Sequence, residues 1–165
     1  MSDNVYENDP AVIFMWRRID ARLTTSGQPA EEQLTDLKRL GVTHAVNLAL
    51  HTHEKALPDE AGSVGALGMR YIHIPVDFNN PADADLAPFC ATMWELEGKV
   101  IHVHCIANFR VSAFLYRYHR DEVRMQEGEA REMLDCIWRP GGVWARFIGD
   151  EQAEALPHRY AKRDY

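Results

Sequence analysis

The stretch Lys99-Val-Ile-His-Val-His-Cys-Ile-Ala-Asn-Phe-Arg-Val-Ser-Ala-Phe-Leu-Tyr116 decides the fold that this sequence encodes. Its first part, Val100 to His104, predicts a buried strand; a short loop follows, and a helix is expected to begin near Arg110. The N-terminus of a helix offers unpaired backbone N–H groups and a partial positive charge, so it can hold an anion such as phosphate. The same field, with Arg110 added, favours the thiolate form of Cys105.

A cysteine in this position has two interpretations. Free cysteines are among the most buried residue types, so Cys105 could belong to an ordinary core, with Arg110 a solvated helix residue. The order of strand, cysteine, loop, arginine and helix favours instead a nucleophile beside an anion site. Asn108 can supply the sharp bend of the loop, because Asn tolerates a positive φ better than most other residues.

Length and charge restrict the class of protein. The chain has 165 residues, of which 46% are apolar and 26% charged, which suits one soluble domain with a sizeable core. No apolar run approaches the roughly 18 to 20 residues that span a bilayer. The net charge of −7 argues against non-specific binding to nucleic acid or to an anionic membrane. We therefore expect neither among the partners, and the sequence leaves the oligomeric state open.

The N-terminus and the cysteines indicate the compartment. Residues 1–10 are acidic and polar and have the features of neither a signal peptide nor a basic targeting segment. The three cysteines, Cys90, Cys105 and Cys136, are an odd number without a metal-type pair, which favours reduced thiols over a disulfide framework. We expect a cytoplasmic protein.

Hydrophobic periodicity predicts strands that alternate with helices. The expected strands are 17–25, 43–50, 70–76 and 100–104, and 11–16 is an early strand or an arm over the core. The expected helices are 29–40, 85–97 with Asp85 as its cap, one from about 110, 129–138 and 143–156. The segments 51–68 and 77–83 are expected to be loops, the first with one helical turn. We expect 1–10 to be disordered or an arm, 11–156 to form the domain and 157–165 to form a tail.

This alternation predicts an α/β fold: a single domain with a central, mostly parallel sheet of four to five strands flanked by helices. In such sheets ligands bind beyond the carboxyl ends of the strands. Cys105 follows one predicted strand and Asp77 follows another, so we expect both residues at that edge of the sheet.

Four pieces of the sequence together resemble a known family. They are Thr25-Ser-Gly-Gln-Pro29, Leu40-Gly-Val-Thr-His-Ala-Val-Asn-Leu48, Gly68-Met-Arg-Tyr-Ile-His-Ile-Pro-Val-Asp77, and the pair His104-Cys105 followed by an arginine and a helix. In this order they resemble the cysteine-based protein tyrosine phosphatase superfamily, particularly its compact dual-specificity branch. The upstream half is similar to a bacterial subgroup of phosphatase-like domains, and the resemblance covers roughly residues 19–118.

The resemblance implies hydrolysis of a phosphate monoester, either phosphotyrosine or a related group in a protein or a small phosphate ester, without a metal or an organic cofactor. Cys105 would attack phosphorus and form a phosphocysteine, while Asp77 would protonate the leaving oxygen and then activate water. Arg110 and the backbone N–H groups of the loop would hold the phosphate oxygens. His104 would tune the thiolate, and Ser112 would donate a hydrogen bond to the sulfur. The loop residues are Ile106, Ala107, Asn108 and Phe109.

The loop departs from the family pattern. The family has five residues between the cysteine and the arginine, with a glycine third and Ser or Thr after the arginine. This sequence has four, with Asn108 at the glycine position and Val111 after Arg110. A cysteine, four residues and an arginine resembles the active-site loop of rhodanese-like sulfurtransferases, which would carry a persulfide on Cys105. A non-catalytic phosphate-binding pseudophosphatase is the third interpretation.

Other polar residues are weaker candidates. His51-Thr-His53 and His102-Val-His104 each place two imidazoles on one face of a strand, where they could bind zinc. No third ligand accompanies them at a regular spacing, so we favour a structural role and expect no metal site. Asp83 and Asp85 are alternatives to Asp77 as the acid. Phe109 is expected either to plug the loop from below or to form one wall of the site.

Overall fold

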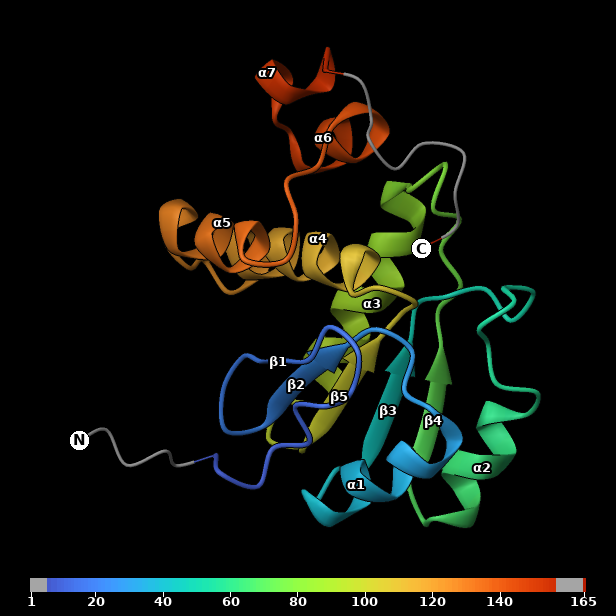
Figure 1. The fold of residues 1–165 in the computed structure, drawn as a ribbon. Helices are drawn as coiled ribbons and strands as arrows, with labels where there is room; N and C mark the ends of the chain where they lie inside the picture. The colour runs from blue at the N-terminus through green and yellow to red at the C-terminus, as the bar shows by residue number, and fades with distance from the viewer. Residues whose placement is uncertain (1–5, 157–164) are drawn as a thin grey trace.

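The computed structural model describes residues 6–156 and 165, and within them five strands form one sheet (Figure 1). The strand order is β1-β2-β5-β3-β4; β1 is antiparallel to β2, and all other neighbours are parallel. This confirms the predicted α/β fold, and it places the strand before Cys105 in the middle of the sheet. The strands are β1 Arg17–Arg18, β2 Leu23–Ser26, β3 His44–Asn47, β4 Arg70–His73 and β5 Ile101–His104.

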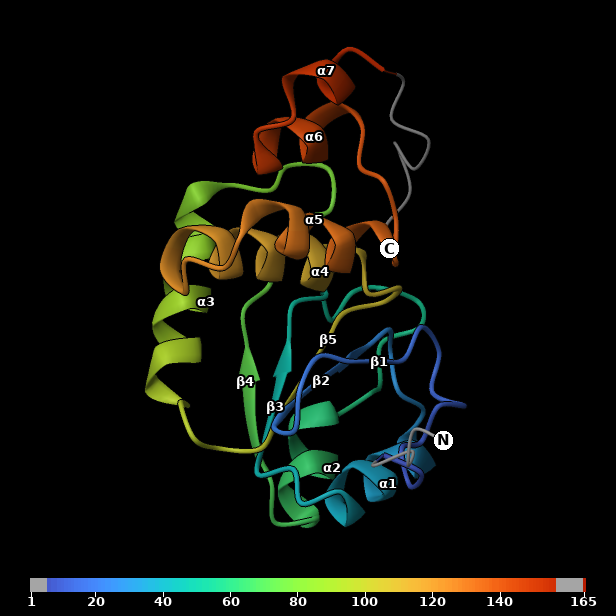
Figure 2. The same cartoon turned by 90° about the vertical axis from the view of Figure 1, so that its left-hand side faces the viewer.

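Helices flank the sheet (Figures 1 and 2). A 3₁₀ turn, η1, leads into α1, and a π-helical turn, η2, continues α4. The helical elements are η1 Glu31–Gln33, α1 Leu34–Arg39, α2 Glu60–Ala66, α3 Asp83–Glu95, α4 Phe109–Arg117, η2 Tyr118–Glu122, α5 Glu127–Asp135, α6 Gly142–Ile148 and α7 Glu151–Glu154.

The sheet separates two hydrophobic clusters, because successive strand residues face opposite sides. Ala45 of β3 packs into the smaller cluster, which includes Leu37 of α1. Val46, the next residue, packs into the larger cluster, which includes Phe89 of α3 and Phe114 of α4. The larger cluster lies against the element that follows Cys105, so the rigid core fixes the start of α4.

The segment 17–25 forms a hairpin of β1 and β2 rather than the single strand that we predicted. Asp20 makes the turn, because its Oδ1 accepts hydrogen bonds from the N–H groups of Arg22 and Leu23, both at 2.8 Å. A short polar side chain that binds its own backbone favours a turn over a continuous strand. Residues 11–16 contain turns and no strand, so they form the arm that was the alternative prediction.

Helix α2 was predicted as a loop with one helical turn and is longer. Asp59 begins it: the Asp59 side chain accepts the N–H of Gly62 at 3.1 Å, which caps the helix. The glycines and alanines of this segment hide the helical pattern, since they carry little hydrophobic signal.

Two other helix boundaries also differ from the prediction. Helix α3 begins at Asp83, so Asp85 is its third residue, and its carboxylate accepts the N–H of Ala82 at 3.2 Å rather than capping from the first position. The predicted last helix is broken into α6 and α7 by Gly149, whose φ is +81°. Glycine adopts this left-handed conformation without steric cost and commonly ends a helix.

The described part of the N-terminal arm contacts β1. Asp9 accepts hydrogen bonds from Arg18 Nε at 2.8 Å and from Trp16 Nε1 at 3.3 Å. Residues 1–5 of the predicted arm and 157–164 of the predicted tail lie outside the described residues. Among the residues that the structure describes, no helix is long and apolar enough to cross a membrane.

Candidate active site

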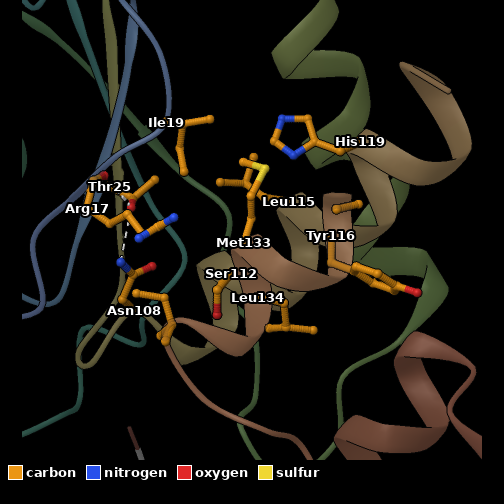
Figure 3. Close-up of a pocket in the computed structure, with 12 residues that line it drawn as sticks. Arg17, Ile19, Thr25, Asn108, Ser112, Leu115, Tyr116, His119, Met133 and Leu134 are labelled. Carbon is orange, nitrogen blue, oxygen red and sulfur yellow. Dashed lines mark hydrogen bonds between the residues drawn. The ribbon is translucent and has the colours of Figure 1, made fainter. Parts of the chain in front are cut away.

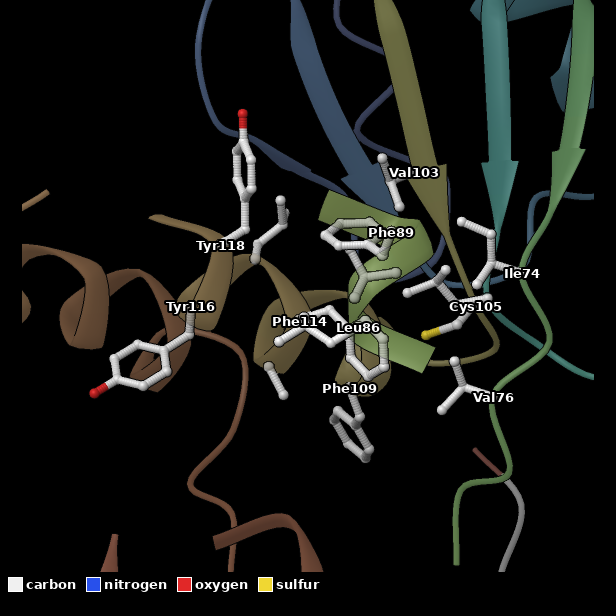
Figure 4. Close-up of a cluster of buried hydrophobic side chains, with 14 of the residues drawn as sticks. Ile74, Val76, Leu86, Phe89, Val103, Cys105, Phe109, Phe114, Tyr116 and Tyr118 are labelled. Atoms are coloured by element: carbon white, nitrogen blue, oxygen red, sulfur yellow. The ribbon is translucent and has the colours of Figure 1, made fainter. Parts of the chain in front are cut away.

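Strand β5 brings Cys105 to the carboxyl edge of the sheet, between β2 and β3. The backbone N–H of Cys105 donates to the Ser26 carbonyl at 3.4 Å, and the N–H of Leu48 donates to the His104 carbonyl at 2.9 Å. The Cys105 side chain is 0% exposed and belongs to the larger hydrophobic cluster, near Val76 (Figure 4). Its sulfur therefore lies in dry, apolar surroundings, where a nearby charge or dipole acts strongly.

Asn108 forms the bend of the loop, as predicted from its tolerance of positive φ. Its φ is 65°, and it is the N-cap residue of α4, whose Ser112 N–H donates to the Asn108 carbonyl at 3.0 Å. The Asn108 side-chain amide donates to the Met15 carbonyl and to Thr25 Oγ1, both at 3.0 Å (Figure 3). The loop is thus attached to the N-terminal arm and to β2, and α4 begins directly after it.

Arg110 is the second residue of α4, and its side chain is 0% exposed. Its Nη1 donates to the Val76 carbonyl at 2.8 Å, and its guanidinium carbon lies 5.7 Å from the centre of the Phe78 ring. Val76 and Phe78 flank Asp77. Arg110 therefore connects the loop after β5 to the segment that carries the candidate acid.

The Asp77 carboxylate is exposed, and its Oδ1 accepts the N–H of Asn79 at 2.9 Å. This bond makes Asp77 part of its own turn, at the same edge of the sheet as Cys105. The two alternative acids have other partners: Asp83 pairs with Arg117 at 2.6 Å, and Asp85 binds the first turn of its own helix.

Ser112 and Phe109 are held by Trp138. The Ser112 hydroxyl donates to the Phe109 carbonyl at 3.1 Å and accepts from Trp138 Nε1 at 3.0 Å, so its proton is directed away from Cys105. The Phe109 ring stacks on the Trp138 ring, with centres 4.6 Å apart and planes inclined by 14°. Tyr165 also packs on Phe109, with ring centres 5.4 Å apart.

An open pocket of about 630 Å³ lies over the loop. Phe109 lines it, which makes this residue a wall of the pocket. The volume suits a small-molecule ligand or a side chain of a partner protein. The cavity behind Asn108 (Figure 3) holds about 10 Å³, room for about one water molecule, so it is too small for a substrate. Other residues that line the open pocket are Phe14, Met15, His53, Lys55 and Ile106.

A solved protein from Shewanella putrefaciens CN-32, described as "Putative phosphatase (DUF442)", shares this arrangement of elements. It is 33% identical to this chain, the match covers 85% of this chain and 92% of that one, and the TM-score is 0.75. This chain belongs to the cysteine-based protein tyrosine phosphatase-like superfamily. Two more distant proteins share the fold of the phosphatase-like chain: Tk-PTP (23% identity, 84% and 95% covered, TM-score 0.65) and TpbA from P. aeruginosa (18% identity, 89% and 93% covered, TM-score 0.66).

A curated relative from Agrobacterium fabrum, the "Beta-lactamase hydrolase-like protein", is 35% identical over 144 residues. The match covers 86% of the phosphatase-like chain and 33% of the relative, so this chain spans about a third of the length of the curated relative that it matches. No family model matches the sequence.

Glu60 is a site residue that the sequence analysis missed. It is 4% exposed, and its Oε2 lies 2.7 Å from Nε2 of His104, which is 1% exposed. Gln28 Nε2 donates to Glu60 Oε1 at 2.8 Å. Burial raises the pKa of Glu60, but the charge and hydrogen bond of His104 and the hydrogen bond of Gln28 together hold it below its ordinary value. A charged residue in a predicted loop is usually solvated, and the only signal for α2 was the possible cap at Asp59.

The motif Thr25-Ser-Gly-Gln-Pro29 supports the loop of the phosphatase-like chain from below. The N–H of Gln28 donates to the Ile106 carbonyl at 3.0 Å, and the N–H of Gly27 donates to the Phe14 carbonyl at 2.8 Å. A Cβ on Gly27 would lie 2.3 Å from the Ile106 carbonyl oxygen, so only glycine fits at this position. The motif therefore has a direct physical role at the site.

We expect Gly27→Ala to lower the free energy of unfolding by about 1–3 kcal/mol, because the added methyl group forces the loop away from β2. Thermal unfolding measures this loss. The matched control is Gly65→Ala in α2, where a Cβ meets nothing within 4 Å and the alanine should be stabilising by about 0.5–1 kcal/mol. An unchanged melting temperature in Gly27→Ala would show that the loop does not depend on this close approach.

The candidate histidines pack and form hydrogen bonds within the fold. In the described ranges, no group of three or more His, Cys, Asp or Glu side chains is placed to hold a metal ion. His102 contacts Thr24 Oγ1 and Ser26 Oγ, both at 2.8 Å; burial first, and then the charge of His104, lower its pKa well below the ordinary value. His51 stacks on His73, with ring centres 3.8 Å apart.

Proposed function

We propose that this phosphatase-like chain carries sulfur on Cys105 as a persulfide and passes it from an anionic sulfane-sulfur donor to a small nucleophile. The observation that carries this proposal is the length of the loop. Four residues lie between Cys105 and Arg110, and α4 begins at the residue after Asn108. A shorter loop encloses a smaller space, and one sulfur atom is smaller than a tetrahedral phosphoryl group.

The attachment of Asn108 supports a loop that keeps this small form. Enlarging the loop by rewinding the first turn of α4 would break the bonds of the Asn108 amide to Met15 and Thr25. It would leave buried polar groups unsatisfied, at a cost of about 1–3 kcal/mol each.

The leaving group of sulfur transfer needs no acid. The Cys105 thiolate attacks the outer sulfur of thiosulfate; a new S–S bond forms, the S–S bond of the donor breaks, and sulfite leaves with the electron pair. Cyanide or a thiolate then attacks the outer persulfide sulfur, removes it and returns Cys105 to the thiolate. Arg110 and the N-terminus of α4 hold the anionic donor in this scheme, and Asp77 has no role in it.

The test is a pair of turnover assays on one preparation: thiocyanate formation from thiosulfate and cyanide, and hydrolysis of an aryl phosphate. We expect thiocyanate formation and little hydrolysis. Hydrolysis without thiocyanate would contradict the proposal, and phosphate binding without either activity would favour the pseudophosphatase.

Hydrolysis of a phosphate monoester is the second candidate, and the likeness to the S. putrefaciens protein favours it. TpbA of P. aeruginosa has been solved in complex with phosphotyrosine, so this fold can present a phosphoryl group to its loop. In this reaction Cys105 forms the phosphocysteine, Arg110 holds the phosphoryl oxygens, and Asp77 protonates the leaving oxygen and then activates water. The substrate would be a phosphorylated protein or a small phosphate ester.

Asp77→Asn separates the two candidates. Under sulfur transfer, we expect thiocyanate formation to stay within about twofold of the wild type, because sulfite leaves without a proton. Under phosphate hydrolysis, the loss of the general acid should lower turnover by about 10²- to 10⁴-fold. The measurement is the turnover number of the variant in both assays; a large loss of thiocyanate formation would contradict the proposed mechanism.

A further inference from the structure

The hydrogen bonds behind the loop form a connected chain of contacts. Glu60 Oε2 contacts His104 Nε2 at 2.7 Å, and His104 Nδ1 contacts the Cys105 carbonyl at 3.1 Å. On the other side, Gln28 Nε2 donates to Glu60 Oε1 at 2.8 Å, and the Gln28 N–H donates to the Ile106 carbonyl at 3.0 Å. Two successive carbonyl groups of the loop are therefore held from behind, and Glu60 joins the two sides.

We propose that Glu60 is a positioning residue that keeps His104 in its charged, doubly protonated form and orients the loop so that its N–H groups face the reacting anion. The proposal rests on Cys105 reacting as a thiolate, which both candidate functions require. Glu60 itself touches neither the sulfur nor the loop and acts through His104 and Gln28.

The hydrogen bonds of His104 define its protonation. The Cys105 carbonyl can only accept a hydrogen bond, so Nδ1 must carry a proton. His104 and Gln28 lower the pKa of Glu60 against the effect of its burial, so its carboxylate is ionised at neutral pH and accepts a second proton, from Nε2. With both nitrogens protonated, the ring is an imidazolium whose positive charge lies directly behind Cys105 and favours the thiolate.

The two carbonyl contacts also orient the loop. In a trans peptide the carbonyl and the N–H point in opposite directions, and the described residues contain no cis peptide bond. Holding the Cys105 carbonyl from behind turns the Ile106 N–H forward, and holding the Ile106 carbonyl turns the Ala107 N–H forward. Successive N–H groups aimed at one point form an anion-binding concavity.

Other titratable groups face this pair from neighbouring strands. His102 lies two residues earlier on β5, and burial lowers its pKa well below the ordinary value, so it is neutral. Burial is also the main cause that lowers the pKa of His73 on β4, and burial raises the pKa of Tyr71 to about 12. His51 stacks at the exposed end of this group.

The test is an ultraviolet difference titration of the Cys105 thiolate in the wild type and in Glu60→Gln, each with its own Cys105→Ser blank. Glutamine keeps the size and the hydrogen bonds of Glu60 but not its charge. We expect the midpoint of thiolate formation to rise by about one pH unit, which lowers the thiolate fraction below the midpoint about tenfold. Nitrogen NMR of His104 should show two protonated ring nitrogens in the wild type and one in the variant.

Glu95→Gln, an exposed position on α3, is the matched control and should leave the titration unchanged. An unmoved midpoint in a folded Glu60→Gln variant would overturn the proposal. If circular dichroism shows that Glu60→Gln does not fold, His104→Gln gives the same decision, since it keeps a donor for the Cys105 carbonyl and removes the charge. The titration needs neither sulfur transfer nor phosphate hydrolysis, so its outcome is independent of the turnover assays.

Discussion

The Cys105→Ser variant is expected to lose thiocyanate formation by more than about a thousandfold while keeping the wild-type fold. A serine hydroxyl cannot form a persulfide, and at 0% exposure it is not deprotonated by the field of α4 and Arg110 to the extent that a thiol is. The measurement is the initial rate of thiocyanate formation at saturating thiosulfate, together with circular dichroism.

Cys136→Ser is the matched control, because Cys136 is an exposed free cysteine far along the chain in the residue after α5. Its rate should equal that of the wild type. Equal rates in Cys105→Ser and the wild type would assign the sulfur chemistry to another thiol and remove Cys105 from the mechanism.

The Arg110→Lys variant is expected to lower the second-order rate constant for thiosulfate by about 10²- to 10³-fold. The planar guanidinium donates to the Val76 carbonyl and faces the Phe78 ring, and a lysine ammonium has neither the fork nor the flat shape to keep this geometry. Positive charge alone would therefore not restore the site. The measurement is kcat/KM for the donor at fixed cyanide.

Arg39→Lys is the control for this exchange, because Arg39 lies on the surface of α1 in an exposed pair with Asp36. Exposed ion pairs contribute about 0–1 kcal/mol, so activity and stability should not change. If Arg110→Lys kept the wild-type kcat/KM, the anion would be held by the loop N–H groups alone.

The parts of the site that are local in sequence could be predicted. Strand β5, the bend at Asn108 and the start of α4 follow one another along the chain, so residue pattern and backbone preference were sufficient to place them. The same holds for the parallel sheet, because alternating strands and helices leave few other arrangements.

The parts that depend on distant contacts could not be predicted. Glu60 and His104 are 44 positions apart, and Arg110 and Val76 are 34 apart, and no local pattern indicates either pairing. The hairpin turn at Asp20 was missed because a single side chain, binding two backbone N–H groups, overrides an apparently continuous strand. The cytoplasmic location and the physiological donor remain predictions, and so does any activity of a longer protein of the kind found in A. fabrum.

The intact mass of the protein after incubation with thiosulfate tests the central claim most directly. The protein is separated from the donor without reductant, and part of it is then treated with cyanide. We predict that the wild type gains the mass of one sulfur atom, that cyanide removes it, and that Cys105→Ser gains none. An unchanged mass in the wild type, together with hydrolysis of an aryl phosphate that requires Cys105, would contradict the account and identify the chain as a phosphatase.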